Sequence, residues 1–387
     1  MYNFNFNLPT KVLFGAGRLQ DLHNEKLPGK KALIVTYEDK TTEKFGYERQ
    51  LEKELDLANI KYVLFDGVRA NPRSEDVMKG AKIARQNGCD FVVALGGGSV
   101  MDAAKCIALM MNNDGDLWDY SKSAKGGKKD FANNACPLVC VTTTAGTGSE
   151  VDMFAVISND ALNEKTGIFD ASMFPVLSVV DSNLTASVSP EFTAYQGMDA
   201  FYHAAESVIN KNEHPVGEMF ALKAIELIAK YLPRAYKDGN DKEARDYVTL
   251  ANSLAGYYML CTSEHTMEHS MGSSHPNLIH GAGLIMISHA YFDFFAERKA
   301  CEPQMIKMAK AMGVVDASTG KDFVKAMDNL IAQVGCKDLR MSDVGITKDE
   351  LPTITKRIHE VLGGDNSADP ITLSDEDYLC ILTQSYK

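Results

Sequence analysis

The segment that decides the fold reads FVVALGGGSVMD and runs from Phe91 to Asp102. Its first part, Phe91–Leu95, is apolar at every position, which is typical of a parallel strand covered by helices on both faces. Three glycines follow this strand directly, and a helical pattern, Asp102–Met111, comes after them. A strand, a glycine turn and a helix in this order predict one βα unit of an open parallel sheet.

Similar units surround this one. Further compact runs of apolar, β-favouring residues are Ala32–Val35, Tyr62–Phe65, Leu138–Val141 and Val176–Val180. Helical patterns such as Ser74–Gln86 lie between them, and the polar segment Ser121–Asn134 predicts an exposed loop. The alternation predicts a doubly wound, Rossmann-like α/β domain over residues 1–187.

The second half of the chain has a different pattern. From about Ser189 no strand pattern appears, and apolar residues recur at helical spacing. Two such series are Ala221, Ile225, Ile228, Leu232 and Phe323, Met327, Leu330, Val334, the second followed by Gly335 as a stop signal. We therefore expect an all-helical domain over residues 188–387, with the boundary near Thr185–Pro190.

The bulk properties limit the class of protein. With 387 residues, two domains are expected. The formal net charge of −12 argues against nucleic acid or an anionic membrane as a partner, because both require a basic surface. Met1–Phe14 holds no apolar run long enough for a signal peptide, and the scattered cysteines form no CxxC pair. The sequence thus predicts a cytoplasmic protein with reduced thiols.

The glycine run has two interpretations. Gly96, Gly97, Gly98 and Ser99 could bring backbone N–H groups and a helix N-terminus to a phosphate. They could instead form only a tight turn, with Ser99 and Asp102 capping the helix. The position between a strand and a helix favours phosphate binding, although the pattern is not GxGxxG. The hydroxyl-rich loop Thr142–Glu150 follows the next strand, and ligands bind at the carboxyl ends of parallel strands.

The end of the first predicted α/β strand bears on cofactor choice. Glu38 and Asp39 follow it within the run Thr36–Lys40. A carboxylate at this place accepts hydrogen bonds from a ribose 2′-hydroxyl and repels a 2′-phosphate. This predicts NAD(H), with NADP(H) as the alternative because Lys40 could bind a phosphate.

Histidines are concentrated in the helical half. His265 and His269 are four residues apart, which places them on one helix face, and Asp199 and His203 have the same spacing upstream. A lone histidine on an apolar helix is more often a hydrogen-bonded core residue than a ligand. Asp199, however, lies in a largely uncharged stretch, and a buried carboxylate is rare without a cation. Imidazoles with a carboxylate favour a site for divalent Fe, Zn, Co or Ni between two helices.

The charge pattern around these histidines bears on the substrate. No lysine or arginine occurs between Arg245 and Arg298. A phosphorylated or carboxylated substrate would require cationic donors there, so we expect a small neutral substrate.

Taken together, these motifs resemble the iron-containing (group III) alcohol dehydrogenase family, which includes butanol, propanediol and lactaldehyde dehydrogenases. The resemblance covers nearly the whole chain, starting at Phe14-Gly15-x-Gly17. The matching motifs are Gly96-Gly97-Gly98-Ser99-x-x-Asp102, Thr143-Thr144-Ala145-Gly146-Thr147, Gly197-Met198-Asp199-x-x-x-His203, His265-x-x-x-His269 and His280-Gly281. It implies hydride transfer between NAD(P)(H) and a small primary alcohol or aldehyde, and a homodimer.

The resemblance also implies residue roles. The metal, Fe²⁺ or alternatively Zn²⁺ or another divalent ion, would be held by Asp199, His203, His265 and His280. His275 is an alternative to His280, but His280-Gly281 keeps the local motif. Contacts to the cofactor would come from Glu38, Asp39, Asn71, Gly96, Gly97, Gly98, Ser99, Asp102, Thr143, Thr144, Thr147, Ser149 and Lys165.

His269 would lie beside the substrate without binding the metal. It then serves either as a proton carrier between substrate and solvent, which we favour, or as a residue that only orients a ligand.

Two other functions remain as alternatives. A non-redox relative of the dehydroquinate synthase type also uses nicotinamide and a metal, but its anionic substrate requires the cationic residues that Arg245–Arg298 lacks internally. A catalytically silent binding protein on the same scaffold would be expected to lose metal ligands, and here all four are present.

Overall fold

The computed structural model describes residues 3–123, 125–359 and 368–387. Within them the chain divides into two units. The α/β unit is Phe6–Ser187, and the helical unit is Val188–Lys387 together with residues 3–5. The sequence analysis placed residues 3–5 in the α/β domain. They join the helical unit, where the ring of Phe4 stacks on His214 with 3.9 Å between the ring centroids.

A parallel six-stranded sheet forms the centre of the α/β unit, in the order β1-β8-β5-β4-β2-β3. Its strands are β1 Lys11–Phe14, β2 Lys31–Tyr37, β3 Lys61–Val68, β4 Phe91–Gly96, β5 Leu138–Thr142 and β8 Leu177–Val180. All five predicted strands are present. The sequence analysis missed the edge strand β1 and the antiparallel hairpin of β6 Phe154–Asn159 and β7 Glu164–Phe169.

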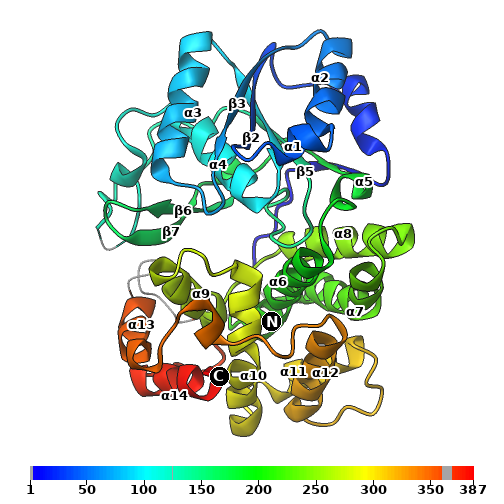
Figure 1. The fold of residues 1–387 in the computed structure, drawn as a ribbon, viewed down its shortest axis with the longest axis vertical. Coiled ribbons are helices and arrows are strands. Elements are labelled where there is room, and N and C mark those ends of the chain that lie inside the picture. Colours follow the sequence, from blue (N-terminus) through cyan, green and yellow to red (C-terminus); the bar gives the residue numbers. More distant parts are fainter. Residues whose placement is uncertain (1–2, 124, 360–367) are drawn as a thin grey trace. The chain divides into compact units, whose positions relative to one another are not determined.

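Alternating side chains of the sheet pack into two separate cores. On β2, Leu33 and Val35 face a cluster with α3 Ser74–Asn87 and α4 Gly98–Met110. Ala32 and Ile34 face the other cluster, which contains α2 Tyr47–Leu57. Figure 1 shows α3 and α4 on one face of the sheet and α2 on the other. Burial on both faces explains why these strands are apolar throughout.

The remaining α-helices of the α/β unit are short. These helices are α1 Thr41–Lys44 and α5 Ser182–Thr185.

The predicted exposed loop is only partly exposed. In the segment 121–134 the structure describes a loop, as predicted, with residue 124 outside the described residues. The expected exposure is wrong at its start, because Ser121 and Ser123 are buried and their hydroxyls hydrogen-bond to each other.

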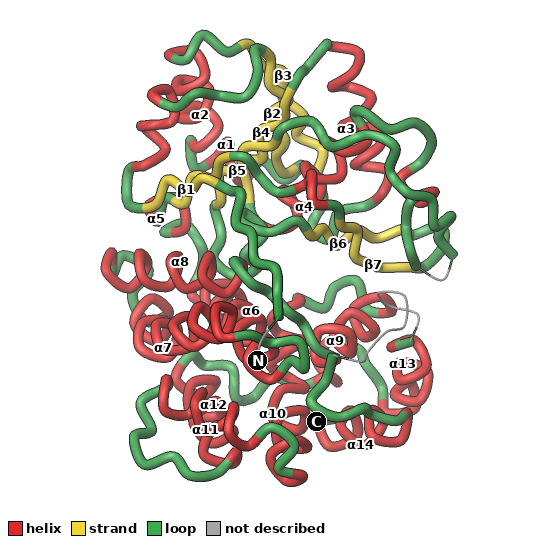
Figure 2. The backbone as a smooth tube through the Cα atoms, turned by 180° about the vertical axis from the view of Figure 1, so that it is seen from behind, coloured by secondary structure: helices red, strands yellow, loops and turns green. Residues whose placement is uncertain are grey.

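The helical unit contains no strand among its described residues (Figure 2). Its helices are α6 Pro190–Ile209, α7 Pro215–Lys237, α8 Lys242–Gly256, α9 Ser263–Ser274, α10 His280–Arg298, α11 Glu302–Ala311, α12 Gly320–Gln333, α13 Leu351–Ile358 and α14 Asp375–Ser385. Both predicted helical series lie within α7 and α12, apart from Val334, which caps α12. None of the helices in the described part of the chain has the length and apolar character that a membrane span requires.

Candidate active site

Three helices of the helical unit bring the predicted metal ligands together. Helix α6 carries Asp199 and His203, α9 carries His265, and α10 begins with His280. The start of α6 is fixed locally, because Ser189 accepts a hydrogen bond from the N–H of Phe192 and Pro190 occupies the first turn.

The four side chains converge on one point. The Nε2 atoms of His203, His265 and His280 lie 3.7, 3.5 and 3.4 Å from Oδ1 of Asp199. Asp199, His203 and His265 are buried, and His280 is partly exposed. Neither Asp199 Oδ1 nor His265 Nε2 has a hydrogen-bond partner among the described residues. A buried carboxylate oxygen surrounded by imidazole nitrogens that do not hydrogen-bond to it fits the ligand set of a divalent cation.

The charges around this point favour a cation there. Burial alone would raise the pKa of the Asp199 carboxyl, but His203 and His280 hold that pKa well below its usual range. Burial likewise opposes protonation of His280, yet Glu268 and Asp199 raise its pKa to about 9. Carboxylates therefore make positive charge favourable at this position, whether it is carried by protons or by a metal ion.

Two fully buried carboxylates hold the imidazoles from behind. Nδ1 of His265 hydrogen-bonds to Oε2 of Glu206, and Nδ1 of His280 hydrogen-bonds to Oε2 of Glu268. A carboxylate on Nδ1 keeps the proton there and directs the Nε2 lone pair toward the metal. Sequence reasoning missed both glutamates. Their helical spacing was a usable signal, because Glu206 follows His203 by three residues on α6 and Glu268 follows His265 by three on α9.

The residue that follows His280 is a glycine for a steric reason. A Cβ at Gly281 would lie 2.2 Å from the carbonyl oxygen of Tyr195, which belongs to α6. Only glycine therefore lets the start of α10 approach α6 this closely. The His280-Gly281 motif thus sets the position of the His280 imidazole.

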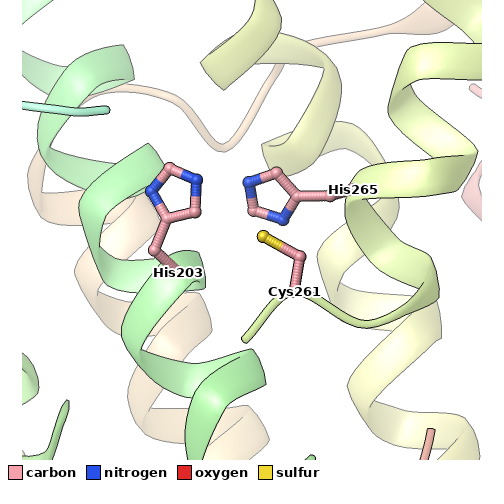
Figure 3. A group of neighbouring side chains, drawn as sticks. All are labelled: His203, Cys261 and His265. Atoms are coloured by element: carbon pink, nitrogen blue, oxygen red, sulfur yellow. The ribbon is translucent and has the colours of Figure 1, made fainter. Parts of the chain in front are cut away.

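The other two histidines, His269 and His275, differ in their distance from this site. His269 is buried, and its ring centroid is 5.2 Å from that of His280. Nε2 of His275, the alternative ligand, lies 3.4 Å from Oε1 of Glu350 and is not in the group around Asp199. A residue that the sequence analysis did not consider, Cys261, has its sulphur beside His203 and His265 (Figure 3).

In the α/β unit, the two predicted cofactor loops are neighbours. Gly96 pairs with Thr142 in the register of β4 and β5, so both loops leave the same edge of the sheet. A Cβ at Gly97 would lie 2.6 Å from the side chain of Thr144, and one at Gly98 would lie 2.4 Å from Thr147. The glycines therefore allow the threonine loop to pack directly on the start of α4.

Asp102 does not cap the helix, as the alternative interpretation of the glycine run would require. Helix α4 begins at Gly98 and has no acidic residue in its first turn. Asp102 instead accepts hydrogen bonds from Ser149 Oγ at 2.7 Å and from the N–H of Val156 at 2.9 Å. Burial raises the pKa of its carboxyl to about 6, an effect that Lys105 opposes. Asp102 and Ser149 thus join α4 to the second loop, whatever contact they make with a cofactor.

Of the other predicted cofactor residues, Glu38, Asp39 and Asn71 follow strands of the six-stranded sheet, whereas Lys165 lies on the separate β6–β7 hairpin. Glu38 and Asp39 are exposed after β2, and Asn71 lies in the loop after β3 with a left-handed backbone, φ 53°. Lys165 is on β7, opposite Ser158 of β6, which in turn forms an isolated bridge with Arg73. The chain order reverses between β2 and β4, and this switch point is where open α/β sheets bind ligands.

The N–H of Gly97 has a partner that sequence reasoning missed. It donates to the Tyr37 hydroxyl at 3.1 Å. Burial raises the pKa of that hydroxyl to about 12, so it stays neutral. The N–H groups of Gly98 and Ser99 come next at the N-terminus of α4, where no preceding helical carbonyl can bind them.

Comparison with known proteins gives consistent matches over both units. The sequence pattern described as "Iron-containing alcohol dehydrogenase" matches residues 9–182. That described as "Fe-containing alcohol dehydrogenase family, C-terminal" matches residues 193–386. The chain is 31% identical to "NADH-dependent butanol dehydrogenase A" of Clostridium acetobutylicum, with 100% of each chain covered. It is 36% identical to "Alcohol dehydrogenase 4" of Schizosaccharomyces pombe over 73% of this chain and 67% of the relative.

Solved structures agree in fold. The chain is similar to an alcohol dehydrogenase of a halo-thermophilic archaeon from a Red Sea brine pool, with a TM-score of 0.93 and 31% identity. That comparison covers 100% of this chain and 99% of the other. The order of a parallel six-stranded α/β sheet followed by a helical region is therefore the one seen in these relatives.

Proposed function

Because the chain belongs to the iron-containing alcohol dehydrogenase family, we propose that it transfers a hydride between NAD(H) and a small neutral primary alcohol or aldehyde. The family is one of NAD-dependent enzymes, and membership implies a divalent metal and a nicotinamide cofactor. The metal ligands are Asp199, His203, His265 and His280. Fe²⁺ is the expected ion, with Zn²⁺ as the alternative.

The observation that carries the proposal is the surroundings of Asp199. Its Oδ1 atom is buried, has no hydrogen-bond partner among the described residues, and lies within 3.7 Å of three imidazole Nε2 atoms. A divalent cation there would lower the pKa of a bound alcohol and would polarise an aldehyde carbonyl. Glu206 and Glu268 hydrogen-bond to Nδ1 of His265 and His280 and keep the proton there, which would leave both Nε2 lone pairs for the ion.

The charges of the helical unit support a neutral substrate. No lysine or arginine occurs in the sequence between Arg245 and Arg298, a stretch that holds His265 and His280. Arg245 itself is buried and donates to the carbonyl of Gly239 and the hydroxyl of Thr193. The names of the relatives, which include butanol and 1,3-propanediol dehydrogenases, suggest short alcohols as the first compounds to test. The non-redox alternative is not supported by any of these features.

An activity screen tests the function. The metal is removed with a chelator, and the protein is reloaded separately with Fe²⁺, Zn²⁺ and Co²⁺. Oxidation of NADH and NADPH is then followed with short aldehydes, and the reverse reaction with the matching alcohols. We expect turnover that needs both a metal and an aldehyde. Absence of hydride transfer with every metal and every short aldehyde would contradict the proposal.

We predict that NADH is preferred over NADPH by about tenfold or more. Glu38 and Asp39 are exposed at the carboxyl end of β2, where a carboxylate repels a 2′-phosphate. Lys40, which could bind that phosphate, forms an ion pair with Asp66. A tenfold preference requires only about 1.4 kcal/mol. Steady-state kcat/KM for both cofactors measures it.

The same kinetics on variants test the cause. The double variant Glu38→Gln with Asp39→Asn is expected to lower the ratio of kcat/KM for NADH to kcat/KM for NADPH. It removes the two charges that repel the 2′-phosphate, with little change of shape. Glu43→Gln, which removes an exposed carboxylate on α1, is the matched control. A tenfold preference for NADPH in the unmodified enzyme would overturn the cofactor assignment.

We predict that Glu206→Gln lowers metal affinity by about 10- to 100-fold, the usual effect of losing a carboxylate behind a histidine ligand. Glu206 hydrogen-bonds to both Nδ1 and the backbone N–H of His265, and it also accepts from Thr262. Competition with a chelator measures the affinity. Glu226→Gln, an exposed glutamate on α7, is the control. Equal affinity in the Glu206 variant and the wild type would mean that Glu206 does not support the ligand.

A further inference from the structure

A second group of metal-binding atoms lies next to the proposed ligand set. One ligand atom each from His203, Cys261 and His265 lie within 4.8 Å of one another. Figure 3 shows the Cys261 sulphur directed toward the gap between the two imidazoles. These rings are stacked, with 4.4 Å between their centroids. The arrangement places a thiol beside two ligands of the set around Asp199.

The backbone on both sides of Cys261 is fixed by α6. The N–H of Leu260 donates to Ser207 Oγ at 3.0 Å, and the Asn210 amide donates to the carbonyl oxygens of Leu260 and Cys261 at 3.4 and 3.3 Å. On the other side, the Thr262 hydroxyl donates to Glu206 at 2.9 Å. Because α6 also carries His203, the thiol and this imidazole are held by one rigid element. With the backbone fixed, rotation about the Cα–Cβ bond of Cys261 sets the position of its sulphur.

We propose that Cys261, His203 and His265 form a sulphur-containing site for a thiophilic divalent cation, of which Zn²⁺ is the expected one. Thiolate and imidazole ligands suit Zn²⁺, with Zn–S about 2.3 Å and Zn–N about 2.0 Å. Tetrahedral bonds of these lengths separate sulphur from nitrogen by about 3.5 Å. The present separations of up to 4.8 Å are therefore closed by rotation of the thiol and small movements of the rings.

The sulphur-containing site competes with the set around Asp199. Nδ1 of His265 is engaged with Glu206, so Nε2 is the atom that His265 offers in either case. This Nε2 atom is buried and has no hydrogen-bond partner among the described residues. One lone pair binds one cation, so a cation held through Cys261 excludes another held by the set around Asp199. Softness of the ion then decides the position, with Zn²⁺ drawn to the sulphur and Fe²⁺ to the carboxylate and three imidazoles.

X-ray absorption at the zinc edge tests the site directly in the wild-type protein. After chelation and reloading with one equivalent of Zn²⁺, we expect a sulphur scatterer at about 2.3 Å. It should disappear in Cys261→Ser and persist in Cys380→Ser, which changes an exposed cysteine on α14. A zinc shell of nitrogen and oxygen only in the wild type would overturn the inference.

A competition experiment gives a second readout. The ratio of Zn²⁺ to Fe²⁺ affinity is expected to fall by about tenfold or more in Cys261→Ser, since serine keeps the size but not the sulphur. An unchanged ratio would also overturn the inference. The sulphur-containing site rests on the proposed function only because it shares His203 and His265 with the set around Asp199. Neither measurement needs turnover, so a failed activity screen with sulphur bound to zinc would reject the proposed function and leave this site standing.

Discussion

Replacing His265 by alanine is expected to remove the bound metal and abolish turnover, while the α/β unit stays folded and still binds NADH. His265 contributes Nε2 to the set around Asp199, at 3.5 Å from Oδ1. Its loss also leaves Glu206 as a buried carboxylate without the imidazole that now hydrogen-bonds to it. His203→Ala should have the same effect on metal and turnover, because the set around Asp199 and the sulphur-containing site both include His203 and each would lose one ligand.

Three measurements check this prediction. Elemental analysis of the purified variants gives the metal content, steady-state assays give turnover, and NADH fluorescence reports on cofactor binding. The proposed metal ligands all belong to the helical unit, whereas the predicted cofactor residues belong to the α/β unit, so the cofactor signal should survive. His289→Ala is the control, because this exposed histidine on α10 pairs with Asp328 away from the site. Full metal occupancy in His265→Ala would remove that residue from the coordination sphere.

The predictable part of the fold follows from burial. Strands such as β4, covered on both faces, are continuous apolar runs that the sequence shows directly. Among the described strands β1 pairs only with β8, and just one of its four residues is buried, so it leaves a weak pattern. The β6–β7 hairpin was missed for a different reason, because polarity does not follow burial along it: Thr166 is buried, whereas Phe169 is exposed.

The predictable part of the site follows from helical spacing. Asp199 with His203 and His265 with His269 could be paired because residues four apart share a helix face. Cys261 could not be found in this way, since it lies in the loop before α9 and its position beside His203 depends on long-range contacts such as the hydrogen bond from Asn210 to its carbonyl. Tyr37 is a similar case, because its contact with Gly97 joins residues 60 positions apart.

The second large effect is expected for His269→Gln, which should lower kcat by about a hundredfold or more while metal content and cofactor affinity stay unchanged. His269 is buried beside the proposed metal ligands, with its ring centroid 5.2 Å from that of His280 and 6.3 Å from that of His265. Alcohol oxidation must pass the hydroxyl proton to solvent, and an imidazole, which in water titrates near pH 6.5, suits that task. Glutamine keeps a polar side chain of similar length but cannot carry a proton.

A proton carrier and a residue that only orients its neighbours predict different results for this variant. One ligand atom each from Glu268, His269 and His280 lie within 4.8 Å of one another, so His269 could also act by fixing the position of His280. In that case His269→Gln would loosen metal binding and leave the shape of the pH–rate profile unchanged. If His269 carries the proton, the metal stays and the profile loses or shifts one limb. Turnover within a few-fold of wild type, with an unmoved profile, would mean that the proton leaves through water alone.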